Sequence, residues 1–186
     1  LTLTAAGGVL TFVGNINQAK ATLQTAVPDE RSCYESERKI PVLAEADIVV
    51  AGGSSRAVAA AVAAAKNGSR VFLVCPMPYL GEDSCGSHLY ERKKDEKLQT
   101  ALARKLFSSK NIPTPLSVKK TLEDELIDNG VDFLYSSFVT NALTDAAGNP
   151  AGVIIANRSG REAIRCKAII DATQEASAAA CLKAER

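Results

Sequence analysis

The chain has 186 residues, of which 46% are hydrophobic and 23% charged, and its formal net charge is +1. These values are typical of a globular domain that is large enough to bury a core, and they exclude a disordered or fibrous chain. Because no basic stripe alternates with aromatic residues, we do not expect nucleic acid as a partner. We also expect no metal site, because the five cysteines and the single histidine show no ligand-like spacing.

The N-terminal segment resembles the remnant of an export signal. Its apolar stretch at 5–13 is far shorter than the roughly 20 residues that a membrane span needs. Ala19-Lys20-Ala21 has the small-x-small form of a signal-peptidase site, and the letters LTAAGG resemble the stretch after the twin-arginine motif of bacterial Tat signals. We therefore assign residues 1–21 to a signal remnant and expect an exported protein, periplasmic or extracellular. The alternative is a plain tail on a cytoplasmic protein.

A strand, a helix and a second strand open the domain that we expect at 46–186, after an extended lead-in at 22–45. Residues 46–51 form a continuous apolar run, which is typical of a strand buried on both faces. A serine cap and Asn67-Gly68 bound an alanine-rich helix, and 70–75 is a second buried strand. This order predicts a βαβ unit of a Rossmann-like parallel sheet.

The rest of the chain predicts helices followed by a β-meander. After a loop at 76–86 we expect a charged amphipathic helix at 90–110 and a second helix at 116–130. The apolar side of the second helix would carry Leu116, Leu122, Leu126 and Ile127. Turn sequences separate three extended segments, which predicts a small antiparallel meander over 131–145, 150–160 and 161–173. The predicted fold class is therefore α/β.

A frayed form of the dinucleotide-binding fingerprint G-x-G-x-x-G follows the first strand. In that motif the first glycine makes a sharp turn, the second lets the backbone approach a pyrophosphate, and the third lets the helix pack on the strand. Here Gly52 is kept, Ser54 stands at the second position and Ala57 at the third. Arg56 adds positive charge near the expected pyrophosphate.

Cys75 departs from the motif, because an acidic residue usually binds the ribose at this position. Two explanations stay open. Either the backbone at Cys75-Pro76 holds the ribose, or the affinity for a nucleotide is reduced.

The predicted meander favours an FAD-binding domain over a nicotinamide-binding one. A Rossmann dehydrogenase sends a third parallel strand directly after its second helix, whereas this chain makes a long detour over 76–130 and then builds the meander. The segments at 46–74, 78–83, 131–164 and 167–173 together resemble bacterial FAD-dependent oxidoreductases with a glutathione-reductase-type FAD domain, which are often Tat-exported. The resemblance covers about residues 40–182. It implies a longer protein, of which this chain is the N-terminal part, apparently truncated at its C-terminus.

The resemblance also implies a set of residues that bind FAD. After one of the implied pairs, Ala172-Thr173, the family usually continues with Gly and Asp, where this chain has Gln174-Glu175. The implied residues are Gly52, Gly53, Ser54, Ser55 and Arg56 at the pyrophosphate, Cys75 and Pro76 at the ribose, Gly81, Glu82 and Asp83 in the loop near the pyrophosphate and flavin, Val139 at the adenine, and Ala172 and Thr173 beside the cofactor.

These features predict the N-terminal FAD-binding part of a flavin-dependent oxidoreductase with a small-molecule substrate. Two alternatives stay open: a nicotinamide-binding Rossmann enzyme, and a non-catalytic remnant of a nucleotide-binding fold that serves as a structural or interaction module. An incomplete parallel sheet would have an unpaired edge, which favours self-association.

The residues with reactive side chains receive no catalytic assignment. His88 would be able to face a flavin, and an exposed or helix-capping histidine is the alternative. We expect buried thiols at Cys75, Cys166 and Cys181, and any disulfide would use Cys33 or Cys85. Flavin chemistry needs few protein groups, because the cofactor itself carries the electrons.

Overall fold

The computed structural model describes residues 2–5, 8–11, 38–87, 98, 100–107 and 113–182. The chain divides into two units, Leu1–Arg38 and Lys39–Arg186. In the first unit, strand β1 (Thr2–Ala5) pairs with β2 (Gly8–Thr11) as an antiparallel hairpin. Several predicted features lie outside the described residues: the cleavage site Ala19-Lys20-Ala21, residues 22–37 of the lead-in with Cys33, His88, and residues 90–97, 99 and 108–110 of the charged helix.

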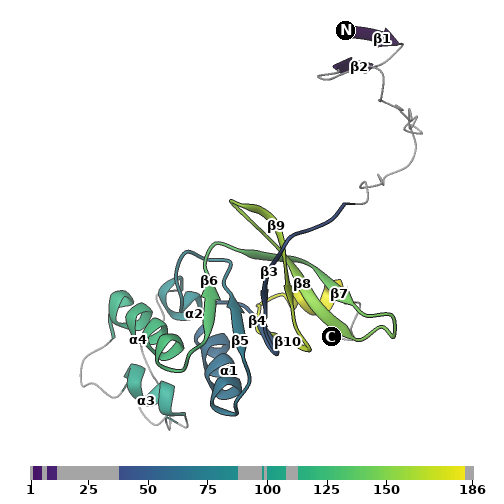
Figure 1. The fold of residues 1–186 in the computed structure, drawn as a ribbon. Helices are drawn as coiled ribbons and strands as arrows, with labels where there is room; N and C mark the ends of the chain where they lie inside the picture. Colours follow the sequence, from purple (N-terminus) through teal and green to yellow (C-terminus); the bar gives the residue numbers. More distant parts are fainter. Residues whose placement is uncertain are drawn as a thin grey trace. The chain divides into compact units, whose positions relative to one another are not determined.

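Four parallel strands form one sheet of the second unit, in the order β10-β4-β5-β6 (Figure 1). Helix α1 (Ser55–Lys66) connects β4 to β5, which confirms the predicted βαβ unit. The helix begins after the Ser54 cap and ends at Asn67, as predicted from its flanking residues. The strands of this parallel sheet are β4 (Ile48–Ala51), β5 (Val71–Val74), β6 (Asp132–Leu134) and β10 (Ala168–Asp171).

Strand β6 corrects our prediction that residues 131–145 belong to the meander. It pairs in parallel with β5, so a third parallel strand does follow the helices. The chain then turns at Ser136, which has a φ of +50°, before the next strand begins in the other sheet. The Ser137 N–H donates to the Cys75 carbonyl at 3.0 Å, which ties this turn to the end of β5.

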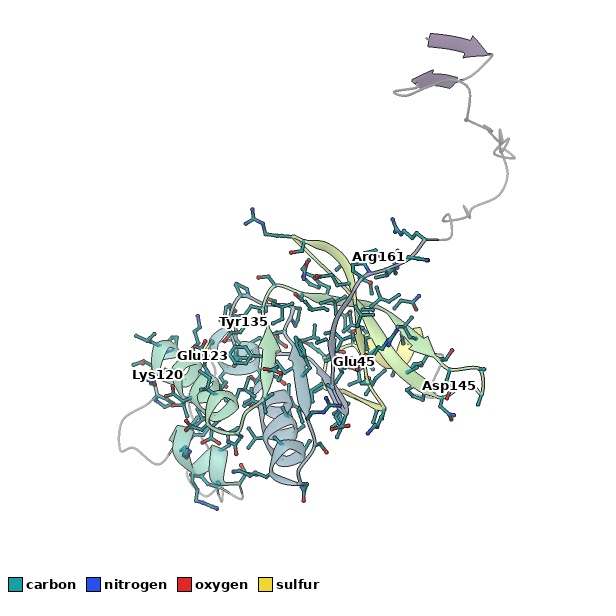
Figure 2. All side chains as sticks on the ribbon, in the orientation of Figure 1. Glu45, Lys120, Glu123, Tyr135, Asp145 and Arg161 are labelled. Carbon is teal, nitrogen blue, oxygen red and sulfur yellow. The ribbon has the colours of Figure 1, made fainter. Side chains whose placement is uncertain are left out.

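The second sheet is mixed, with the order β3-β9-β8-β7. Strands β7 (Phe138–Thr144), β8 (Pro150–Asn157) and β9 (Gly160–Arg165) form the predicted antiparallel meander. Strand β3 (Val42–Glu45) lies within the segment that we assigned to an extended lead-in, and it pairs in parallel with β9. Figure 2 shows Asp145 at the tip of the β7–β8 hairpin.

The other helices are α2 (Glu82–Cys85), α3 (Ala101–Phe107), α4 (Pro115–Asp128) and α5 (Ser177–Cys181). Helix α3 lies within the predicted helix at 90–110, of which the structure describes residues 98 and 100–107, and the Thr100 hydroxyl accepts a hydrogen bond from the Ala103 N–H at its start. None of the described helices has the length and apolar composition needed to cross a membrane.

The apolar side of α4 differs in part from our prediction. Leu122 and Leu126 are buried as expected, but Leu116 is 76% and Ile127 60% exposed. Val118 takes their place, because it lies one helical turn before Leu122, whereas Leu116 lies about 200° around the helix from Val118. Figure 2 shows Glu123 of α4 beside Tyr135, which follows β6.

The parallel sheet has a core on each of its faces. Val50 and Leu73 face a cluster that includes Val58 of α1 and Leu122 of α4, whereas Val49 and Val74 pack in a second cluster with the mixed sheet. The unit therefore has three layers: helices, parallel sheet and mixed sheet (Figure 1). Since all four strands of the parallel sheet run the same way, the ends of β4, β5 and β10 and the start of α1 meet at one edge, where ligands bind in sheets of this kind.

Candidate cofactor-binding site

The turn after β4 requires a glycine at its first position. Gly52 has a φ of +126°, and a Cβ atom there would lie 2.8 Å from the Ala172 carbonyl oxygen. The Ala172 N–H in turn donates to the Ala51 carbonyl at 2.9 Å. The structure thus brings together two predicted parts of the site, the glycine turn and Ala172-Thr173 at the end of β10.

Helix α1 points its N-terminus at this edge of the sheet. The Ser54 hydroxyl is the N-cap, and its oxygen accepts a hydrogen bond from the Ala57 N–H at 3.2 Å. Any contact of this hydroxyl with a ligand would be made in addition to the cap. The first turn holds no acidic residue, and the Arg56 side chain is exposed there. The partial positive charge of a 12-residue helix therefore favours an anion at this end.

Cys75 serves as a packing residue beneath the turn. A Cβ atom on Gly53 would lie 2.2 Å from the Cys75 sulfur, so the thiol fills the space that a side chain at position 53 would need. The thiol is fully buried and donates to the Tyr79 carbonyl at 3.3 Å. Burial raises the pKa of Cys75 to about 11. The side chain is thus a neutral part of the core, and a ribose contact here would fall to the backbone at Cys75-Pro76.

The loop with Gly81, Glu82 and Asp83 contacts the glycine turn directly. The Gly81 N–H donates to the Gly53 carbonyl at 2.7 Å. The carboxylate of Asp83 accepts from the Ser55 N–H at 2.9 Å, and its other oxygen accepts from the Ser55 hydroxyl. Two of the predicted binding segments are thus bonded to each other.

Glu82 lies at the same turn. Burial, together with the charge of Asp83, raises the pKa of Glu82, and the nearby Gly53 backbone N–H offsets part of this rise. Two neighbouring carboxyl groups of α2 therefore lie at the turn, and that of Asp83 accepts a hydrogen bond from the Ser55 N–H.

Asp171 organises the end of β10, and our sequence analysis missed it. Its carboxylate accepts from the Thr173 hydroxyl at 2.6 Å and from the Ala179 N–H at 2.8 Å. Burial raises the pKa of Asp171, but the hydrogen bonds from Thr173, Ala178 and Ala179 outweigh it, so the net pKa lies below its usual value. The open hollow that follows is lined by Gln174, Glu175, Ala176, Ser177 and Ala180.

Val139 lies apart from this edge of the parallel sheet. It is on β7 of the mixed sheet, opposite Ile155 of β8, and it packs against the core between the two sheets. Among the described residues, no hydrogen bond joins Val139 to the turn at 52–57. The predicted adenine contact at Val139 therefore stays a prediction.

A βαβ turn at the edge of a parallel sheet, with an antiparallel meander packed on one face, defines an FAD-type α/β domain. The chain belongs to the FAD-dependent oxidoreductase family, because the model of that family matches residues 47–186. This match favours FAD over the nicotinamide alternative. No curated protein matches the sequence at a significant level.

Several solved structures have a similar fold. THI4 of Thermovibrio ammonificans is 15% identical, with a TM-score of 0.58 over 75% of this chain and 62% of that one. A geranylgeranyl bacteriochlorophyll reductase-like protein from Thermoplasma acidophilum is 17% identical, with a TM-score of 0.51 over 69% of this chain and 39% of that one. A flavocytochrome c3 fumarate reductase is 17% identical, with a TM-score of 0.50 over 70% and 34%. The chain thus spans about three fifths or less of these proteins.

The cofactor of this family is FAD, and the backbone of the turn fits its pyrophosphate. Gly52 has the conformation that only glycine adopts readily, and α1 presents its positive end at the same place. FAD, when bound, supplies the electron-transfer chemistry. The residues of this chain would hold and orient it.

Proposed function

We propose that this chain is the FAD-binding part of a flavin-dependent oxidoreductase, with the FAD pyrophosphate at the N-terminus of α1. The observation that carries the proposal is the glycine turn itself: Gly52 has a φ of +126° and lies close to the Ala172 carbonyl, so the chain passes directly from the end of β4 to the N-terminus of α1 at this edge of the sheet. Arg56, which is exposed in the first turn of α1, would add a positive charge beside the pyrophosphate.

Other residues would contact the rest of the cofactor. Pro76 would line the ribose region, and Ala172-Thr173 would lie beside the cofactor where β10 ends. Val139 would offer its backbone to the adenine. The substrate would be a small molecule, and the oxidation or reduction would take place on the flavin.

Titration with FAD tests the proposal. We expect FAD to bind the 186-residue chain, ADP to compete with it, and riboflavin, which has no phosphate, to compete poorly. Gly52→Ala and Ser54→Val should each weaken FAD binding at least about tenfold. Gly52→Ala pushes the turn away from the Ala172 carbonyl oxygen, which would lie 2.8 Å from the new Cβ atom, and Ser54→Val places a branched side chain at the second position of the motif, where the pyrophosphate must approach. Gly130→Ala is the matched control, since Gly130 also has a positive φ, +65°, but has open space around its Cα. FAD binding that ADP does not affect would contradict the proposal.

We also propose that the protein is exported, on the strength of the Ala19-Lys20-Ala21 motif alone. The mature protein should then begin near Thr22. N-terminal sequencing of the protein from its native host checks this, and a cytoplasmic protein that keeps residues 1–21 would contradict it.

Self-association through strand β10 is a further proposal about partners. Among the described residues β10 is an edge strand of the parallel sheet, so one side of its backbone is available for pairing. Sedimentation at increasing concentrations should show dimers or larger species, and a monomer at all concentrations would contradict the proposal.

A further inference from the structure

One backbone N–H group of the proposed pyrophosphate site already has a carboxylate partner. The Ser55 N–H donates to Asp83 at 2.9 Å, and the Ser55 hydroxyl donates to the second oxygen of the same carboxylate. Glu82, the neighbour of Asp83, lies near the Gly53 backbone. Ser55 is in the first turn of α1, where the fold would present donors to a phosphate.

The backbone of the loop holds these carboxylates in place. Gly81 donates to the Gly53 carbonyl at 2.7 Å and has a φ of +81°, which starts the short helix α2 beside the turn. A Cβ atom on Gly81 would lie 2.9 Å from Leu122 of α4, so the loop is packed between the turn and that helix. The hydrogen bond from Gly81 to Gly53 and the packing of the loop against α4 therefore hold Glu82 and Asp83 beside the turn.

A carboxylate and a phosphate would bind to the same groups of this turn. Both are anions that accept hydrogen bonds from backbone N–H groups, and both are stabilised by the positive end of a helix. One N–H group cannot serve both fully. An incoming pyrophosphate would also meet the negative charge of Asp83, with the exposed Arg56 as the cationic residue in the first turn of α1.

We propose that Asp83 is an internal substitute for the pyrophosphate, and that FAD binds only after the Asp83 carboxylate has left Ser55. The inference rests on the proposed function, since it concerns the same turn. It assigns a role to Asp83 in setting the affinity for the cofactor: the carboxylate stabilises the free chain and competes with FAD.

The test compares the parent chain with Asp83→Asn and Asp83→Ala by titration with FAD, ADP and riboflavin. We expect both variants to bind FAD and ADP about tenfold more tightly than the parent, and riboflavin with unchanged affinity. Without ligand, Asp83→Ala should unfold at a lower denaturant concentration, whereas Asp83→Asn should keep part of the cap and remain folded.

The matched control is Asp145→Asn. Asp145 also accepts hydrogen bonds from backbone N–H groups, those of Ala147 at 2.9 Å and Asn149 at 2.8 Å, but it lies at the tip of the β7–β8 hairpin (Figure 2). This substitution should leave the affinity for FAD and ADP unchanged. A purely structural role of Asp83 would lower stability without raising the affinity for ADP.

The outcomes separate this inference from the proposed function. Unchanged affinity in both Asp83 variants, together with weaker binding in Gly52→Ala, would overturn the inference and leave the pyrophosphate site standing. If neither the parent nor the Asp83 variants bind FAD or ADP, the proposed function itself fails, and the inference with it. The inference would be supported most strongly if the parent bound FAD and ADP poorly and the Asp83→Asn variant bound both well.

Discussion

The N-termini of α1 and α4 are capped in different ways. At α4 the cap is local: the Thr114 hydroxyl accepts from the Ser117 N–H, and the Ser117 hydroxyl accepts from the Thr114 N–H. At α1 the Ser54 cap is also local, but the Ser55 N–H is bonded to Asp83, which lies 28 residues further along the chain. One helix end depends on its own sequence, and the other on a distant loop.

On our proposal, this difference separates a structural cap from a ligand site. The reciprocal cap of α4 occupies its donors with residues of the same turn, so a ligand would gain nothing by replacing them. The anion at α1 belongs to a separate segment, and we propose that another anion takes its place.

Gly52→Ala should have the largest effect on stability. The substitution places a side chain on a backbone with a φ of +126° and pushes it against the Ala172 carbonyl oxygen, 2.8 Å away. Strain and overpacking together should cost about 2–5 kcal/mol of unfolding free energy, measured by urea denaturation. Since the clash is with backbone, Cys75→Ala should not rescue it. A loss below about 1 kcal/mol would contradict this packing.

Gly53→Ala should cost less, about 1–3 kcal/mol, because its new methyl group meets a side chain, the Cys75 sulfur, and not backbone. Combining it with Cys75→Ala removes the obstacle. The double variant should be no less stable than Cys75→Ala alone, which a double-mutant cycle measures. Additive losses in that cycle would show that the turn at 52–53 is packed differently.

Thr114→Ala should lower the free energy of unfolding by about 1 kcal/mol, the usual cost of losing a side-chain N-cap. The loss should come without any change in the affinity for FAD, because this cap lies on α4. Asp83→Ala should cause a comparable loss of stability and yet tighten FAD binding. An equal response of FAD affinity to both substitutions would remove the distinction between the two helix ends.

Leu116→Ser should have the smallest effect, within about 0.5 kcal/mol of the parent. Leu116 is in the first turn of α4 but is 76% exposed, so its replacement removes little apolar contact. Thermal or urea unfolding measures the difference. A loss above about 1 kcal/mol would mean that Leu116 belongs to the core, as the sequence had suggested.

Local chemistry in the sequence predicted the βαβ unit well. Ser54 before the apolar helix and Asn67-Gly68 after it are signals that act within a few residues, and the structure has the helix between them. The alternation of extended segments and turn sequences likewise predicted the antiparallel pairing of β7, β8 and β9. Helix caps and turns depend on residues a few positions apart in the chain, so they can be predicted from a single sequence.

Long-range contacts explain what the sequence did not reveal. The break between β6 and β7 occurs at Ser136, where neither glycine nor proline marks the turn, so the two strands looked like one segment. Asp83 reaches Ser55 across 28 residues, and Asp171 reaches Ala179 across an irregular turn. No spacing rule predicts such pairs, because they follow from how the strands and the loop are packed.

An amide NMR titration of the 186-residue chain with ADP tests most directly whether the start of α1 is the cofactor site. We expect the N–H resonances of Gly53 and Ser55 to shift, because ADP would replace the carboxylate partner of Ser55 and bind beside Gly53. Those of Ser117 and Val118 at the start of α4 should stay in place. ADP binding that leaves both Gly53 and Ser55 unshifted would contradict the assignment of the pyrophosphate to this turn.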